Sequence, residues 1–160
     1  MRPNGFEELK ARYGLPWVSQ EEKERFERHW MCLWSFRDFQ LRTGVTWPHN
    51  SIPFDRIYCN RDILPVLDKT FVYLIKLNLI GEIHSFDGCW NVRMKRRNLN
   101  EPSVHSFGIA LDFNANLMPF GSKECLWSDK FLQAMDACDW ILGAEFPIKD
   151  FQHFQWCSGY

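Results

Sequence analysis

The 160-residue sequence predicts an α+β fold in which helices flank a small antiparallel sheet. Three observations lead to this prediction. Apolar residues recur with the period of a helix through much of residues 1–80, and short segments with the period of a strand follow residue 81. A further helical pattern at 129–142 is inserted among these strands. We expect a single domain over 1–160, mainly helical up to residue 80 and α+β from there on.

Two helices are predicted before residue 44. Residues 6–13 have an amphipathic pattern that ends at Gly14. Ser19-Gln-Glu-Glu22 is a capping box, in which the side chains of the first and last residues bind each other's backbone N–H groups. It opens the longest helical pattern of the chain, near 20–41, and Gly44 ends it. We assign the aromatic face of this helix to the core; it consists of Phe26, Trp30, Leu33 and Trp34.

A loop and a third helix complete the first half of the chain. Residues 44–55 include Trp47-Pro-His-Asn50 and Ile52-Pro53, which interrupt any regular element. Asn60 is positioned to cap a helix near 61–79, where Pro65 is tolerated because it falls in the first turn. Gly81 ends this helix.

Short strands dominate the second half. A period-two pattern from Ile83 to Met94, divided by Asp87-Gly88, predicts two strands or one bent pair. The helix at 129–142 begins with the capping residue Ser128 and closes at Gly143. The other elements are a polar loop at 95–102, a strand at 107–113, a loop at 117–127 and a strand at 154–156.

Charge and composition narrow the possible partners. The 19 Lys and Arg nearly cancel the 20 Asp and Glu, so the chain does not attract a polyanion over long range, and we expect no nucleic-acid partner. The basic cluster Arg93-Met-Lys-Arg-Arg97 is typical of a solvated loop. No stretch approaches the ~18 apolar residues of a membrane span. The residues Met1-Arg-Pro-Asn-Gly-Phe-Glu-Glu lack the apolar segment of a secretory signal, so we expect synthesis in a cytoplasm.

The six cysteines are scattered and form no C-x-x-C pair. This spacing, in a cytoplasmic chain, predicts free and largely buried thiols; a thiolate zinc site stays open but has no local signature.

Two stretches hold residues suited to metal chemistry. Ser103-Val-His-Ser-Phe-Gly-Ile-Ala-Leu-Asp112 places a histidine and a carboxylate seven residues apart, and Asp150-Phe-Gln-His153 supplies a second pair. A catalytic zinc needs three N or O ligands, an open position and a further carboxylate that accepts a proton from water. His105, Asp112, Asp150 and His153 match these needs one for one.

Structural roles stay open for each of these residues. An aspartate among apolar strand residues, such as Asp112, costs several kcal/mol to bury unless it is paired or binds a metal. Asp150 alone is compatible with a turn. The remaining histidines are assigned to the surface or to hydrogen-bonded core positions; they are His29, His49 and His84.

The stretch from Ser103 to Asp112 resembles the S-x-H-x-x-G-x-A-x-D signature of zinc D-Ala-D-Ala carboxypeptidases and L-alanyl-D-glutamate endopeptidases. The stretch Asp150-Phe-Gln-His153 is similar to the second motif of that family, an acidic residue three positions before the last histidine ligand. Residues Phe86-Asp-Gly-Cys-Trp-Asn-Val-Arg93 resemble the segment that precedes the signature in the bacteriophage endolysin branch. The motifs span roughly 86–156.

The resemblance implies a ligand set and a mechanism. Zinc would be bound by His105, Asp112 and His153, with Asp150 as the general base and Arg93 stabilising the oxyanion. The implied fold is the small α+β fold that these peptidases share with the Hedgehog signalling domain.

Three of the implied roles have alternatives. Many relatives carry Glu where this chain has Asp150, so Glu145 is a second candidate for the base. Arg96 or Arg97 is an alternative to Arg93. Ser103 either positions the substrate or forms a local hydrogen bond in its loop.

The implied activity is hydrolysis of the stem or cross-link peptide of bacterial peptidoglycan, at an L-Ala–D-Glu or a D-Ala–D-Ala type of bond. A chain without a secretory signal fits a monomeric phage endolysin, which accumulates in the host cytoplasm and reaches the cell wall after a holin opens the membrane. Two other readings stay open. The chain is a non-catalytic zinc-containing binding module of the same fold, or a metal-free helical interaction protein.

Overall fold

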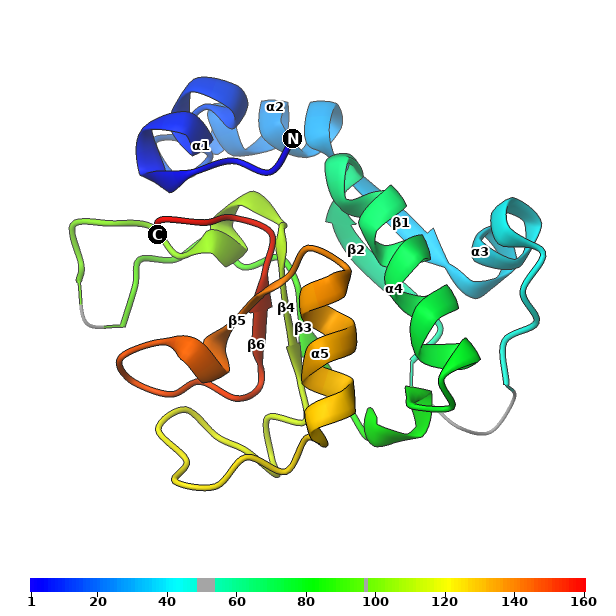
Figure 1. Cartoon of the computed structure of the whole chain (residues 1–160). Coiled ribbons are helices and arrows are strands. Elements are labelled where there is room, and N and C mark those ends of the chain that lie inside the picture. Colours follow the sequence, from blue (N-terminus) through cyan, green and yellow to red (C-terminus); the bar gives the residue numbers. More distant parts are fainter. Residues whose placement is uncertain (49–53, 97) are drawn as a thin grey trace.

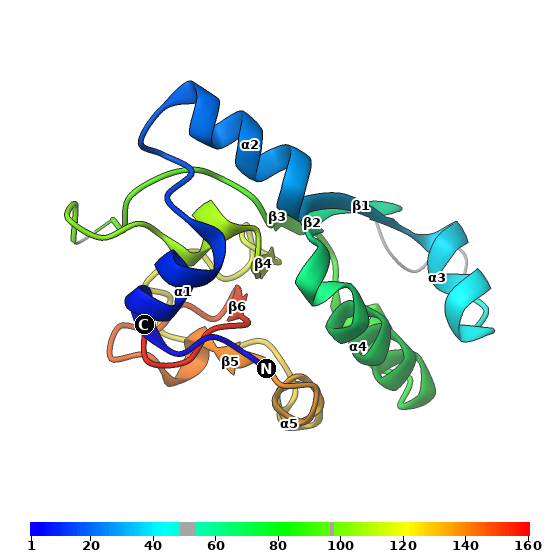
Figure 2. The same ribbon diagram turned by 90° about the horizontal axis from the view of Figure 1, so that it is seen from above.

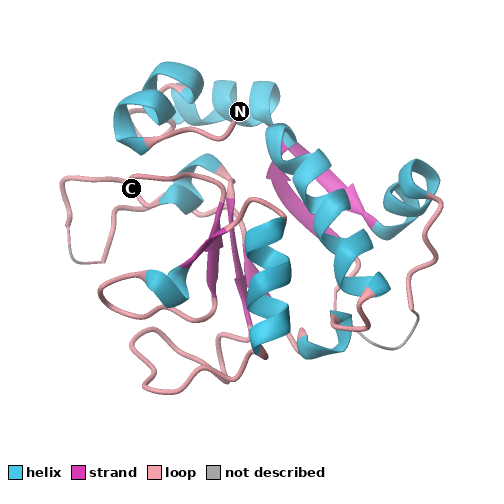
Figure 3. Ribbon diagram, viewed as in Figure 1, coloured by secondary structure: helices cyan, strands magenta, loops and turns pink. Residues whose placement is uncertain are grey.

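Two small antiparallel sheets, surrounded by five α-helices, organise the part of the chain that the structure describes (Figures 1 and 3). The computed structural model describes residues 1–48, 54–96 and 98–160. The α-helices are α1 (Gly5–Tyr13), α2 (Gln20–Trp30), α3 (Phe36–Thr43), α4 (Leu64–Lys76) and α5 (Asp129–Ala137). Short 3-10 helices are η1 (Arg61–Ile63), η2 (Ile80–Glu82), η3 (Val104–Phe107) and η4 (Gly143–Glu145).

The strands are β1 (Met31–Ser35), β2 (Arg56–Asn60), β3 (Phe86–Gly88), β4 (Ala110–Phe113), β5 (Ile141–Leu142) and β6 (His153–Gln155). Strands β1 and β2 form one sheet, and the other four form a second sheet in the order β3-β4-β6-β5. This mixture of helices with small antiparallel sheets agrees with the predicted α+β class.

Several predicted helix boundaries are confirmed by the capping contacts. The Ser19 hydroxyl accepts the N–H of Glu22 at the start of α2. The side chains of Asn60 and Ser128 likewise accept backbone N–H groups at the starts of η1 and α5. Gly44 ends α3 in the left-handed conformation, at φ 69°. Local chemistry therefore fixes where these helices begin and end.

The prediction of one continuous helix near 20–41 is wrong, because a strand divides it. Helix α2 stops at Trp30, residues 31–35 form β1, and the Ser35 hydroxyl accepts the N–H of Asp38 to start a new helix, α3. Strand β1 pairs with β2, with Met31 opposite Asn60. The apolar run around Leu33 fits a helix or a strand, and a partner almost 30 residues away in sequence decides for the strand.

The helix predicted over 129–142 is too long. It ends at Ala137, Asp139 adopts a positive φ of 71°, and Ile141–Leu142 pair with β6 instead of continuing the helix. The third helix is also shorter than its predicted range near 61–79, since α4 ends at Lys76.

The predicted strands are shortened as well. Only Phe86–Gly88 of the pattern at 83–94 lies in a strand, and Met94 forms an isolated bridge with Pro102. The start of the strand predicted at 107–113 is displaced to Ala110 by η3, and the last strand lies at 153–155. The loop predicted at 44–55 is irregular over 44–48, whereas 49–53 lie outside the described residues.

Helix packing closes the core around the larger sheet. Helix α5 packs against α4 and against β5, and the two helices lie close together in both views (Figures 1 and 2). The indole N–H of Trp140, which is fully buried, donates to the hydroxyl of Thr70 on α4 at 2.8 Å. None of the described helices is long and apolar enough to cross a membrane. All six cysteines are free, and Cys125 is the one that is exposed.

Candidate metal centre

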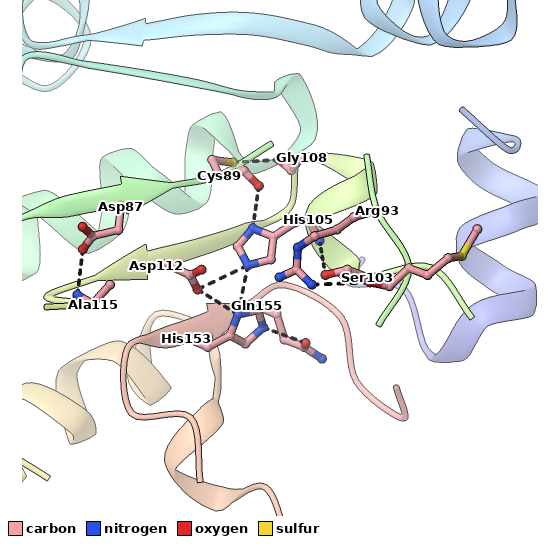
Figure 4. A network of polar contacts seen from close by, with 11 residues as sticks. Asp87, Cys89, Arg93, Ser103, His105, Gly108, Asp112, Ala115, His153 and Gln155 are labelled. Carbon is pink, nitrogen blue, oxygen red and sulfur yellow. Dashed lines mark hydrogen bonds and ion pairs between the residues drawn. The ribbon is translucent and has the colours of Figure 1, made fainter. Parts of the chain in front are cut away.

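Three side chains from separate elements meet at one point beside the central strand β4 (Figure 4). His105 comes from η3, Asp112 from β4, and His153 from the first position of β6. The Asp112 Oδ1 atom lies 3.2 Å from His105 Nε2 and 3.0 Å from His153 Nδ1. The two imidazole nitrogens are 3.2 Å apart. The structure therefore brings together the three residues predicted as metal ligands.

The sheet register and one glycine create this convergence. Antiparallel pairing of β4 with β6 places Asp112 directly opposite His153. Gly108 ends η3 in the left-handed conformation, at φ 66°, and so turns the chain from His105 into β4. A Cβ atom on Gly108 would lie 2.8 Å from the sulfur of Met31, so glycine is needed there both for conformation and for space.

The outer nitrogen of each imidazole has a partner of its own. His105 Nδ1 lies 2.8 Å from the carbonyl oxygen of Cys89. A carbonyl only accepts, so this nitrogen carries the proton and Nε2 presents a lone pair to the centre. His153 Nε2 lies 3.0 Å from Oε1 of Gln155. Partners of this kind orient metal-binding histidines.

Burial and neighbouring groups shift the pKa values of Asp112 and His153 in opposite directions. Burial raises the pKa of Asp112, but the contacts with His105 and His153 outweigh it and hold this pKa well below its usual range. For His153, burial lowers the pKa, and the contact with Asp112 more than reverses that effect, so the net shift is upward. Asp112 is thus ionised, and His153 retains a proton to higher pH than usual.

The donor set fits zinc. Two imidazole nitrogens and one carboxylate oxygen are ligands that zinc accepts in sites with an open fourth position. A tetrahedral ion with bonds of about 2.0–2.2 Å separates its ligand atoms by about 3.3–3.6 Å. The observed separations of 3.0–3.2 Å are slightly shorter, so the three side chains need little movement to hold the ion.

A pocket of about 340 Å³ opens over Asp112 and His153. Its lining includes basic and polar residues, such as Arg93 and Ser103, and an apolar segment at 146–148. The candidate metal centre is therefore accessible to a ligand that enters from the surface.

Asp150 lies in this pocket. Its Oδ1 atom is buried and has no hydrogen-bond partner among the described residues, which is costly for a carboxylate unless a ligand completes it. Its backbone N–H donates to the carbonyl of Gly143 at 3.0 Å, and its carbonyl accepts the N–H of His153 at 3.0 Å. Glu145, the alternative base, is exposed on η4 and does not line the pocket.

The sequence predicts that Gly143 ends a helix, but in the structure this glycine permits a close contact with the backbone of another segment. A Cβ atom at this position would lie 2.2 Å from the carbonyl oxygen of Asp150 and 3.0 Å from that of His153. Only glycine permits this close approach, which holds the turn between the two residues.

The basic cluster at 93–97 contributes to the pocket instead of forming only a solvated loop. The Arg93 backbone is held by Ser103, whose N–H donates to the Arg93 carbonyl at 2.8 Å, and by the Ser106 hydroxyl. Its half-buried side chain lines the pocket. Arg96 also lines the pocket, with its guanidinium 5.2 Å from the ring of Phe120. Arg97 lies outside the described residues.

Ser103 forms the predicted local hydrogen bond and also lies at the pocket. Its hydroxyl accepts the N–H of His105 at 3.4 Å, and the residue also lines the pocket. The assignment of His29 and His84 to structural positions agrees with the structure. His29 is exposed and packs edge-on against Trp30, and His84 is exposed. His49 lies outside the described residues.

Sequence reasoning missed two contributors to the centre, the Cys89 carbonyl and the Gln155 side chain. No side-chain pattern reveals a backbone carbonyl. Gln155 had a detectable pattern, because residues two apart on a strand share a face, and Gln155 is two residues from His153.

One comparison with known proteins bears on the site. A family model described as D-alanyl-D-alanine carboxypeptidase matches residues 97–156. The matched segment includes all three residues of the candidate centre as well as Asp150, and it begins after Arg93. It covers less than half of the chain. No curated protein and no solved structure matches the chain. The match supports the resemblance to zinc peptidases that the motifs indicate.

Proposed function

We propose that this chain is a zinc metallopeptidase that hydrolyses the peptide part of bacterial peptidoglycan. The observation that carries the proposal is the convergence of His105, Asp112 and His153 beside a pocket that Asp112, His153 and Asp150 line. The family match supports the substrate class. The fold would be the one that these peptidases share with the Hedgehog signalling domain, with 1–160 as one catalytic domain.

Zinc held by the three side chains would act as a Lewis acid towards a peptide carbonyl and a water molecule. The Asp150 carboxylate takes the proton of the attacking water, because Asp150 lines the same pocket as Asp112 and His153. It then returns this proton to the departing amine. Arg93 donates hydrogen bonds to the oxyanion, since its guanidinium stays charged and its backbone is fixed by Ser103 and Ser106.

The biological role that we propose is lysis of a bacterial host by a phage endolysin. The resemblance of residues 86–93 to the endolysin branch supports it. The enzyme would act as a monomer on the stem or cross-link peptide, from the host cytoplasm, after a holin opens the membrane. The scissile bond is of the L-Ala–D-Glu or the D-Ala–D-Ala type.

Clearing of a suspension of outer-membrane-permeabilised Gram-negative cells tests the proposal. We expect the wild type to clear the suspension and Asp150→Ala to do so about 10²- to 10⁴-fold more slowly with zinc still bound, because general-base catalysis contributes that much. Glu145→Ala is the matched control and should clear like the wild type. Equal clearing by wild type and Asp150→Ala would remove Asp150 from the mechanism. No clearing by either, with zinc bound, would favour a non-catalytic binding module.

A further inference from the structure

We infer that Gln155 is a positioning residue that selects the tautomer of His153 and so directs the lone pair of Nδ1 to the metal position. The inference rests on the proposed zinc site. His153 and Gln155 are two residues apart on β6, and their side chains meet at 3.0 Å between Nε2 and Oε1 (Figure 4). Both residues are buried, with exposed fractions of 7% and 3%, so water does not replace this contact.

A second hydrogen bond fixes the orientation of the Gln155 amide. The amide nitrogen of Gln155 lies 2.8 Å from the carbonyl oxygen of Cys157. A carbonyl only accepts, so the NH₂ group must face Cys157, and the amide oxygen must face His153. That oxygen in turn only accepts, so Nε2 of His153 carries the proton. A neutral imidazole has a single N–H, and Nδ1 is left with its lone pair.

Without Gln155, we expect His153 to carry its proton on Nδ1 instead of Nε2. His153 Nδ1 lies 3.0 Å from Oδ1 of Asp112, a carboxylate oxygen that accepts hydrogen bonds and so favours a proton on Nδ1. A proton there would occupy the lone pair that a metal requires. Gln155 therefore favours the proton on Nε2 of His153, whereas Asp112 favours it on Nδ1. The balance between these two side chains decides whether the Nδ1 lone pair is free to bind a metal ion.

The two imidazoles of the centre differ in how they are held. His105 is oriented by the backbone carbonyl of Cys89, which no substitution removes. His153 is oriented by a side chain, so its metal-binding nitrogen depends on the residue at position 155. Substitution at this position therefore isolates the effect of the tautomer.

Zinc affinity measured with a competing chelator tests this role. We expect Gln155→Leu to bind zinc ions about 10- to 100-fold more weakly than the wild type, the usual loss when the partner of a ligand is removed. Gln155→Glu restores an acceptor for the N–H of Nε2 and should recover most of that loss. Thr70→Val is the matched control. It also loses a buried hydrogen bond, the one to Trp140, and should lower the melting temperature without changing the zinc affinity.

The tautomer itself is measurable by nitrogen-15 NMR of the metal-free protein, above the pKa of His153. We expect the wild type to carry the proton on Nε2, and Gln155→Leu to move it towards Nδ1. Wild-type protein with the proton on Nδ1, or Gln155→Leu with unchanged zinc affinity, would overturn the inference. If the wild type binds no zinc, the proposed function fails, and the NMR result still decides the role of Gln155. If Gln155→Leu does not fold, the wild-type tautomer and Gln155→Glu decide it.

Discussion

At the scale of single residues, a proton and a metal ion compete for one imidazole lone pair of the centre, that of His153. Asp112 is ionised because its contacts with the two histidines outweigh its burial. The same carboxylate raises the pKa of His153, so this imidazole retains a proton that a metal must displace. A metal site built in this way is sensitive to pH through His153 rather than through Asp112.

We therefore expect zinc affinity to fall as the pH is lowered through the raised pKa of His153. Below the raised pKa of His153, each zinc ion must release a proton from the ring, whereas above it no proton competes. Asp112 contributes nothing in this range because its pKa is lowered. Calorimetric titration in two buffers of different ionisation enthalpy measures the released proton. Affinity that does not change over this range would contradict the account.

Arg93 and Arg96 lead to separate predictions, because Arg93 is half-buried with its backbone held by Ser103 and Ser106, whereas Arg96 is exposed. Arg93→Ala should lower kcat about 10²- to 10³-fold, the usual effect of losing an oxyanion donor, and leave zinc affinity unchanged. Arg96→Ala is the matched control, since Arg96 is exposed and packs over Phe120. Steady-state kinetics on a soluble stem peptide measures both. A larger loss for Arg96→Ala would transfer the oxyanion role to that residue.

At the scale of elements, tight backbone contacts position the side chains of the candidate metal centre. Gly143 packs against the carbonyls of Asp150 and His153, and Gly108 fits beside Met31. The N-terminal half supports the signature directly, because the backbone N–H of Asn60 donates to the Gly108 carbonyl at 2.8 Å. The site therefore depends on elements far from the metal ligands in sequence.

Gly143→Ala tests this dependence. The added Cβ would lie 2.2 Å from the Asp150 carbonyl oxygen, so the turn must shift, and we expect a loss of about 1–3 kcal/mol in the free energy of unfolding together with weaker zinc binding. Gly81→Ala is the control, because no atom lies within 4 Å of its added Cβ. Urea unfolding and chelator competition measure the two effects. Equal behaviour of the two variants would show that the close approach is unimportant.

The elements also show what sequence can and cannot predict here. Caps such as Ser19 and Ser128 are local, and their helix starts were predictable. Strand β1 was read as helix because its partner β2 is remote in sequence. The signature predicted that His105 and Asp112 lie near each other, and the turn at Gly108 brings their side chains together. The contact between Gly143 and Asp150 was invisible, because it depends on the path of a loop.

At the scale of the whole molecule, both halves of the chain enclose one core, and the two ends lie together. The backbone N–H of Gly5 donates to the carbonyl of Ser158, close to the end of the strand that carries His153. The buried side chain of Tyr13 on α1 packs against Phe107 of η3. Order at the centre and global stability are therefore coupled, and ligand binding at the centre should stabilise the entire fold.

Zinc should raise the melting temperature of the whole chain in one transition. Binding at 100 times the dissociation constant contributes about 2.7 kcal/mol if the unfolded chain does not bind. A chelator should reverse the shift, and Asp112→Asn should abolish most of it, because an amide is a poor zinc ligand. Calorimetric melting with and without zinc measures this. A shift that persists in Asp112→Asn would place the metal elsewhere.

The central claim is tested most directly by mass spectrometry of muropeptides after purified peptidoglycan is digested with the zinc-loaded protein. The account predicts new free amines and carboxylates at one peptide bond of the stem or cross-link, with the glycan intact, and their loss in Asp150→Ala. The mass of the fragments also identifies the bond. Peptide fragments that stay unchanged after digestion with folded, zinc-loaded wild-type protein would contradict it.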